Sequence, residues 1–221
     1  GTRLFGAGLE LGGKDPAYVW SGCNLDHAIE NLVDGSYFNS GQSCCGIERI
    51  YVDEHIFDKF VDGFKSITEK YILGNPLEEN TNLGPVVRMN AAKYIRTQVS
   101  QALNKGAKNI IDSNKFKAYN WTNCYVSPSD IIQVDHSMEF MKEETFGPTV
   151  GIMKVKNEEE AINLMNDSAY GLTASIWTSD KEFAQSMGSK IETGTFFMNR
   201  CDYLDPGLAW TGVKDTGIGV T

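Results

Sequence analysis

The stretch VGIMKVKNEEEAINLMNDSAYGLTASIWTSDKEFAQSMGSKIETGTFFMN, residues 150–199, decides the class of fold. Three apolar runs typical of strands alternate with two amphipathic helical patterns. In chain order these elements are a strand at 150–155, a helix at 158–166, a strand at 174–178, a helix at 181–190 and a strand at 195–199. Such alternation favours parallel strands covered by helices. The sequence therefore predicts an α/β fold with an open, mostly parallel sheet flanked by helices.

The residues before this stretch follow the same alternation. Helices are predicted at 25–38, with Asn24 as N-cap and Gly41 as terminator, at 56–71 and at 90–104, followed by Gly106. Extended segments are predicted at 49–52, 109–111, 124–126 and 130–134. Parallel sheets usually place their working residues at the carboxyl ends of strands. That rule does not place the segment around Cys44, because this segment follows a helix.

The composition narrows the classes of partner. The chain has 221 residues and a formal net charge of −9, and no run of lysine and arginine is longer than two. A nucleic-acid or anionic-membrane partner would need a local basic patch, so neither partner is expected. No apolar run approaches the ~20 residues of a membrane span. Because the chain opens without methionine, we expect it to be a piece of a longer protein.

The five cysteines point to a reducing compartment. They stand at 23, 44, 45, 124 and 201, an odd number without regular spacing, which argues against a disulfide framework. There is no C-x-x-C pair and the three histidines are scattered, so no metal site is expected. The expected location is cytoplasmic.

Two adjacent cysteines end a small polar loop, Phe38-Asn39-Ser40-Gly41-Gln42-Ser43-Cys44-Cys45. A thiolate in a glycine-containing loop, near backbone N–H groups that could hold an oxyanion, is typical of a nucleophile. The alternative is that Cys44 is simply a small buried residue, and packing is the preferred interpretation of Cys45.

A second candidate is Glu10, in Leu9-Glu10-Leu11-Gly12-Gly13-Lys14. Apolar neighbours would desolvate the carboxylate and raise its pKa towards that of a general base. The alternative is a glutamate that points to water.

Two further segments complete the set of candidates. In Lys142-Glu143-Glu144-Thr145-Phe146-Gly147-Pro148 a carboxylate could bind a ribose diol and the phenyl ring could lie on a flat ring, although a solvated turn is the alternative. The glycine-rich tail 212–219 lacks phosphate-loop spacing, and Gly6-Ala7-Gly8 does not continue into a dinucleotide fingerprint.

In this order and spacing the segments resemble the aldehyde dehydrogenase family over nearly the whole chain. The resemblance rests on residues 9–14, 38–44, 143–148 and 212–217, together with Gly74-Asn75-Pro76, Thr81, Gly84, Pro85, residues 166–172, Ala174 and Ser175. Residues 205–211 depart from the family's commoner Pro-Phe-Gly-Gly pattern.

The resemblance implies a role for each matching residue. Cys44 matches the nucleophile that forms a thiohemiacetal and then, after hydride transfer to NAD or NADP, a thioester. Glu10 matches the general base for its hydrolysis. Glu144 and Phe146 match residues at the nicotinamide ribose, and Asn199 matches a structural asparagine near the site.

The resemblance also sets expectations for the whole chain. Residues 1–221 are expected to be the family's catalytic domain, with 1–8 as a lead-in from a cofactor-binding domain that is absent. The cofactor would be bound mainly by that domain, so the chain alone is expected to be inactive as a dehydrogenase. The full-length enzyme is expected to oxidise a small-molecule aldehyde as a homo-oligomer, a dimer or tetramer. The alternatives are a relative that passes the acyl group to coenzyme A, which would lack the carboxylate at Glu10, and a non-catalytic scaffold domain.

Overall fold

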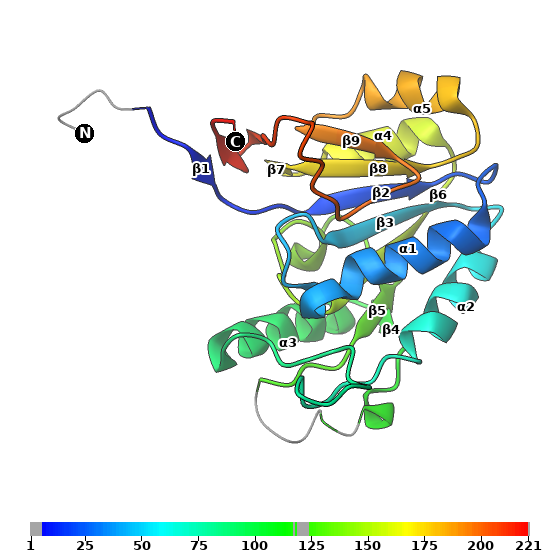
Figure 1. Ribbon diagram of the computed structural model, residues 1–221. Helices are drawn as coiled ribbons and strands as arrows, with labels where there is room; N and C mark the ends of the chain where they lie inside the picture. The colour runs from blue at the N-terminus through cyan, green and yellow to red at the C-terminus, as the bar shows by residue number, and fades with distance from the viewer. Residues whose placement is uncertain (1–5, 117, 119–123, 221) are drawn as a thin grey trace.

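The computed structural model describes residues 6–116, 118 and 124–220, and a seven-stranded sheet lies at its centre. The strand order is β4-β5-β6-β3-β2-β8-β9 (Figure 1). These strands are β2 (Asp15–Val19), β3 (Ile47–Asp53), β4 (Lys108–Asn109), β5 (Ser129–Ile132), β6 (Thr149–Val155), β8 (Thr173–Trp177) and β9 (Thr195–Met198). Only β4 runs antiparallel to its neighbour. The predicted α/β fold with an open, mostly parallel sheet is confirmed.

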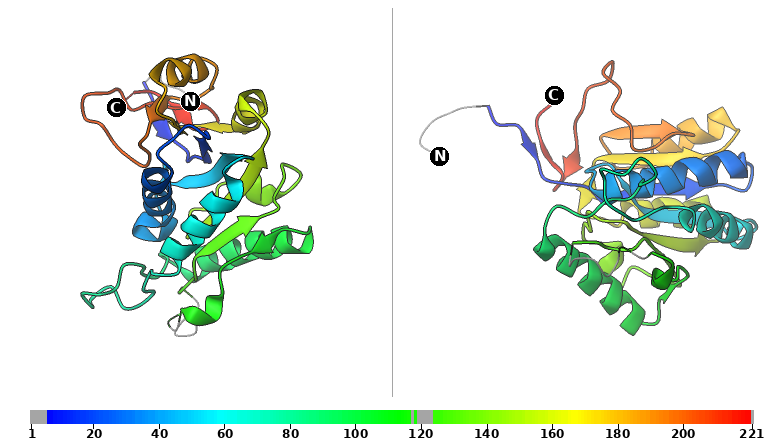
Figure 2. Two further views of the ribbon diagram at one scale, coloured as in Figure 1. Left: turned by 90° about the vertical axis from the view of Figure 1, so that its right-hand side faces the viewer. Right: turned by 60° about the horizontal axis from the view of Figure 1, so that its bottom comes forward.

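Helices cover both faces of the sheet. In the described residues they are α1 (Leu25–Tyr37), α2 (Phe57–Thr68), α3 (Met89–Asn104), α4 (Glu158–Asn166) and α5 (Lys181–Gly188). Side chains alternate along a strand, so Ile50 belongs to the apolar cluster that contains residues of α1 and α2, while its neighbour Tyr51 belongs to the cluster that contains residues of α3, α4 and α5. The left view of Figure 2 shows α1 and α2 on one side of the sheet and α3 and α4 on the other.

Local side-chain caps explain where several helices begin. Asn24, Asn157 and Asp180 each accept a hydrogen bond from the backbone N–H three residues later, at the starts of α1, α4 and α5. The predicted cap at Asn24 is confirmed. Helix α1 ends at Tyr37, and a 3-10 turn (Phe38–Gly41) leads on to the adjacent cysteines.

The strand β2 was not predicted, although it lies between β3 and β8 in the middle of the sheet. It begins with a buried aspartate and a proline, residues that are rare inside strands. The register with β3 shifts between Asp15 and Pro16, which is where a sheet tolerates proline. The predicted extended segments at 109–111 and 124–126 also differ, since β4 ends at Asn109 and residues 124–126 lie outside the strands.

Four two-residue strands join segments that are far apart in the sequence. β1 (Leu9–Glu10) pairs with β11 (Gly217–Ile218), and β7 (Tyr170–Gly171) pairs with β10 (Val213–Lys214). Figure 1 shows β1 beside the C-terminal segment, at the end of the sheet where β2, β3 and β6 begin. No helix in the described part of the chain has the length and apolar character needed to cross a membrane.

A buried carboxyl on β5 makes the stability of the fold depend on pH. Asp130 is fully buried and accepts a hydrogen bond from Tyr37, and burial raises its pKa from 3.8 to about 7. Between these two values the folded state binds a proton that the unfolded state has released. The free energy of unfolding therefore falls as pH rises, by up to about 1.4 kcal/mol per pH unit.

We expect the substitution Asp130→Asn to remove this contribution. The asparagine keeps an acceptor for Tyr37 but carries no charge, so the variant gains stability relative to the wild type between pH 4.5 and pH 8. Urea unfolding across this range measures the slope, with Asp62→Asn on the exposed side of α2 as control. An Asp130→Asn variant that keeps the wild-type slope would contradict the prediction.

Candidate active site

The candidate residues gather at the amino ends of the parallel strands. Glu10 precedes β2, Cys44 precedes β3, and Glu144 and Phe146 precede β6. Each of them lies on a segment that precedes a strand. In parallel sheets functional residues usually lie at the carboxyl ends of the strands, and this rule does not apply here.

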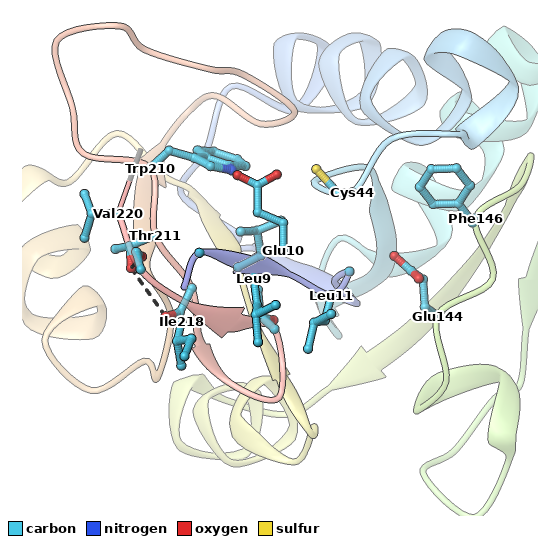
Figure 3. A pocket seen from close by; sticks show the side chains of 16 residues that line it. Leu9, Glu10, Leu11, Cys44, Glu144, Phe146, Trp210, Thr211, Ile218 and Val220 are labelled. Carbon is cyan, nitrogen blue, oxygen red and sulfur yellow. Dashed lines mark hydrogen bonds between the residues drawn. The ribbon is translucent and has the colours of Figure 1, made fainter. Parts of the chain in front are cut away.

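A cavity of about 670 Å³ brings these side chains together. Cys44, Glu10, Glu144 and Phe146 all line it. The rest of its wall comes from Gly8, Leu9, Leu11, Gly12, Leu172, Trp210, Thr211, Gly212, Thr216, Ile218, Gly219 and Val220. Figure 3 shows the Glu10 carboxylate and the Cys44 thiol directed into this cavity, with Trp210 beside Glu10.

The loop that presents Cys44 is fixed by close backbone packing. Gly41 has a φ of 69°, and a Cβ at this position would lie 2.1 Å from the carbonyl oxygen of Gly147. Only glycine permits this approach to the segment that also carries Phe146. On the other side, the Ser40 hydroxyl donates to the Gly84 carbonyl at 2.9 Å.

Cys44 and Cys45 have opposite acid–base properties. A hydrogen bond from the Cys45 thiol lowers the pKa of Cys44 to about 7, although partial burial and the carboxylates of Glu10 and Glu144 act against this. The pKa of Cys45 is raised, by its hydrogen bond to Cys44 and by burial. Cys45 is buried, whereas Cys44 is half-buried and faces the cavity. The geometry thus favours Cys44 as the thiolate of the pair.

Glu10 is more accessible than the sequence suggested. Its side chain is exposed, and Leu9 and Leu11 are themselves 46% and 58% exposed. The expectation of a desolvated carboxylate between two leucines is therefore wrong for the described residues, because β1 pairs with β11 alone and does not enter the core. Glu10 nevertheless lines the same cavity as Cys44.

Glu144 is seated against the two glycines that follow Leu11. Its Oε1 accepts the backbone N–H of Gly13 at 3.1 Å, and a Cβ on Gly12 would lie 2.6 Å from both carboxylate oxygens. Burial raises the pKa of Glu144. Beside it, Phe146 keeps 39% of its surface exposed at the cavity.

A buried ion pair that the sequence analysis missed connects these segments. The Nζ of Lys14 lies 2.6 Å from Oε2 of Glu48 and donates to the Thr145 hydroxyl at 3.0 Å. The Glu48 carboxylate also accepts the backbone N–H groups of Thr145 and Phe146, at 2.9 Å and 2.8 Å. The signal in the sequence is Glu48 with Arg49, two charges in a segment whose other residues, from Ile47 to Val52, are apolar or aromatic, and buried charges require partners.

Asn199 follows a parallel strand of the sheet, whereas Cys44 precedes one. It follows the carboxyl end of β9, where its amide exchanges two hydrogen bonds with the Thr178 backbone, at 3.0 Å and 2.8 Å. Among the cavity residues that the sequence analysis did not select, Trp210 and Thr211 come from the segment that departs from the family pattern.

Neither a metal cluster nor a disulfide occurs in the described part of the chain. No group of three or more His, Cys, Asp or Glu residues there could hold a metal ion. The five cysteines all lie within it, and none is joined to another.

Known proteins similar to this chain were found by sequence and by structure. The aldehyde dehydrogenase family model matches residues 2–221. An aldehyde dehydrogenase-like protein of Schizosaccharomyces pombe is 36% identical over 219 residues, which are 99% of the chain and 44% of that protein.

Two solved structures are also similar. Betaine aldehyde dehydrogenase of Staphylococcus aureus, in complex with NAD⁺, has a TM-score of 0.89 at 32% identity over 96% of the chain and 42% of its own length. Glyceraldehyde-3-phosphate dehydrogenase of Methanocaldococcus jannaschii, complexed with NADP, has a TM-score of 0.90 at 30% identity over 96% of the chain and 45% of its own length. The chain thus spans less than half of each of these relatives.

Proposed function

The chain belongs to the aldehyde dehydrogenase family, and from this premise we propose that it carries the nucleophile and general base of an enzyme that oxidises an aldehyde to a carboxylic acid. The observation that supports this most is the single cavity lined by Cys44, Glu10, Glu144 and Phe146. A nucleophile, a base and a cofactor-facing pair within one cavity are the parts that such a reaction needs.

Cys44 is the proposed nucleophile. With a pKa of about 7, roughly half of its thiol is ionised at neutral pH, so a thiolate is available to attack the aldehyde carbon. The apolar side chains of the wall, among them Leu172 and Trp210, suit the carbon chain of the substrate.

Glu10 is the proposed general base. Its carboxylate, directed into the cavity, would accept a proton from a water molecule that attacks the acyl group on Cys44. The presence of this carboxylate favours hydrolysis over transfer of the acyl group to coenzyme A. The nucleophile and base in one cavity likewise favour an enzyme over a scaffold domain.

The residues present fit the nicotinamide end of NAD or NADP. Glu144 offers a carboxylate held by Gly13, which would accept hydrogen bonds from a ribose diol, and the exposed Phe146 ring offers a flat surface beside it. When bound, the nicotinamide would supply the hydride acceptor. Solved relatives contain NAD⁺ or NADP, so both remain candidates.

The remaining assignments are part of the same proposal. We propose that residues 1–221 correspond to the catalytic domain, with 1–8 as a lead-in, of which residues 1–5 lie outside the described residues. The proposed full-length enzyme binds most of its cofactor with other segments, acts as a homo-oligomer and is cytoplasmic. Relatives more than twice the length of the chain support the first of these points, and its irregularly spaced cysteines support the last.

An ester tests the chemistry of these side chains without the cofactor. In the first step the Cys44 thiolate attacks the carbonyl carbon of p-nitrophenyl acetate, and p-nitrophenolate leaves. Water then loses a proton to Glu10 and attacks the thioester, which releases acetate and the thiolate. We expect a burst of p-nitrophenolate, followed by slower turnover.

The substitution Glu10→Gln should keep the burst and slow the turnover by about 10²-fold, because it removes the base. It also removes a carboxylate that raises the pKa of Cys44, so the burst should be no slower than in the wild type. Glu30→Gln, an exposed change on α1, is the matched control. A wild-type chain without a burst, or an unchanged turnover in Glu10→Gln, would contradict the assigned roles. We also expect little or no NAD(P)H formation from aldehydes by the 221 residues alone, and robust turnover would overturn that part of the proposal.

A further inference from the structure

The segment after β9 runs along α1 towards the end of the sheet where the parallel strands begin. Cys201 packs tightly on this helix, since a Cβ at Gly35 would lie 2.6 Å from its sulfur. The Cys201 thiol also donates to the Asn31 carbonyl at 3.4 Å. These contacts place the next residue, Asp202, beside the loop that contains Cys44.

Asp202 contacts both neighbours of Cys44. Its Oδ1 accepts a hydrogen bond from the Ser43 hydroxyl at 2.7 Å and another from the Cys45 thiol at 3.1 Å. The two donors lie only 3.5 Å from each other. With both flanking side chains on one carboxylate oxygen, the peptide units around Cys44 cannot rotate independently, and its thiol stays directed into the cavity.

We propose that Asp202 is a positioning residue for Cys44, because its carboxylate fixes the two flanking side chains and competes with Cys44 for the proton of the Cys45 thiol. This role rests on the proposed function of Cys44 as nucleophile. Asp202 acts through Ser43 and Cys45, and it does not itself line the cavity.

The competition follows from the chemistry of a thiol. Cys45 has one S–H group, which can be donated to Asp202 or to the Cys44 sulfur but not fully to both. Without Asp202 the proton is free for the Cys44 thiolate, which it stabilises, and one negative charge near that thiolate is lost.

Other carboxylates around Cys44 stay in place in such a variant. They are Glu10 on β1, Asp15 on β2 and Glu144 before β6, while Asp34 on α1 lies near Asp202. Removal of Asp202 should therefore lower the pKa of Cys44 but leave its thiol less well directed.

Two rates separate these effects. Alkylation by iodoacetamide, followed at the Cys44 peptide by mass spectrometry from pH 5 to pH 10, gives the pKa of the thiol. Acylation by p-nitrophenyl acetate at a pH where the thiol is fully ionised reports how well the thiolate is directed at a carbonyl carbon.

For Asp202→Ala we expect the alkylation midpoint to fall by about half a pH unit or more. Acylation of the ionised thiol should fall by about tenfold. Asp202→Asn keeps an oxygen that accepts from Ser43 and should recover part of the acylation rate. Asp205→Asn, which removes the same charge from a turn of the same segment, is the control. A role limited to stability would lower the midpoint of urea unfolding and leave both rates unchanged.

Variants whose alkylation midpoint and acylation rate equal those of the wild type would overturn the role of Asp202 alone. If Asp202→Ala does not fold, Asp202→Asn decides by the same two rates. A wild-type Cys44 that reacts like an ordinary thiol, with a midpoint near 9, would overturn the proposed nucleophile, and the role of Asp202 with it.

Discussion

Replacement of Cys44 by serine should abolish acylation of the chain, with a loss on the order of 10³-fold or more. A serine hydroxyl is almost entirely protonated at neutral pH, whereas a thiol with a pKa of about 7 is about half ionised there. The burst of p-nitrophenolate and the alkylation of peptide 38–45 measure the loss.

The pH dependence of Cys44 alkylation in the wild type tests the same lowered pKa. Because the pKa of Cys44 is lowered from 9.0 to about 7, the alkylation rate should rise with pH up to about 7 and level off near pH 8. An ordinary thiol would still gain rate above that pH.

Cys23→Ser is the matched control. Cys23 follows the carboxyl end of β2, whereas Cys44 precedes the amino end of β3. Burial raises the pKa of the Cys23 thiol to about 11. This variant should keep the full burst. If Cys44→Ser retained more than about a tenth of the acylation rate, Cys44 could not be the nucleophile.

Disruption of the Lys14–Glu48 pair should cause a large loss of stability. In Glu48→Leu the buried ammonium of Lys14 loses its counter-ion, and the backbone N–H groups of Thr145 and Phe146 lose their acceptor. Removal of one partner of a buried ion pair costs about 3–5 kcal/mol. We expect a fall of this size in the free energy of unfolding, measured in urea.

Lys14→Met should have a similar effect, because it leaves the Glu48 carboxylate buried without its cation. The double variant Lys14→Met/Glu48→Leu should lose less than the sum of the two single variants, since it buries no uncompensated charge. The partly exposed pair Lys65–Glu69 at the C-terminal end of α2 is the control, and Lys65→Met should change stability by less than about 1 kcal/mol. Single variants at Lys14 and Glu48 as stable as this control would contradict the prediction.

The outer elements of the fold could be predicted because their signals are local. Helix α4 has the predicted bounds, since Asn157 caps it and three glutamates occupy its first turn. Strand β2 gave no such signal. Its place in the middle of the sheet comes from pairing with β3 and β8. The residue types at Asp15 and Pro16 do not indicate this pairing.

The candidate site was predictable as a set of residues but not as an arrangement. The segments around Glu10, Cys44 and Glu144 do meet at one cavity. That Glu10 is exposed depends on how β1 pairs, and local sequence around Glu10 cannot show this. The contacts of Asp202 with Ser43 and Cys45 connect positions 159 and 157 residues apart, beyond the reach of any spacing rule.

The pairing of β1 with β11 has a consequence for the chain as it is synthesised. Glu10 leaves the ribosome early, but the strand that holds it in place contains Gly217 and is made late. A chain that ended between residues 202 and 217 would contain the Cys44 loop and its contacts to Asp202, but it would lack the strand that pairs with Glu10. Under the proposed roles of Cys44 and Glu10, such a product would be acylated by an ester and would release the acyl group slowly.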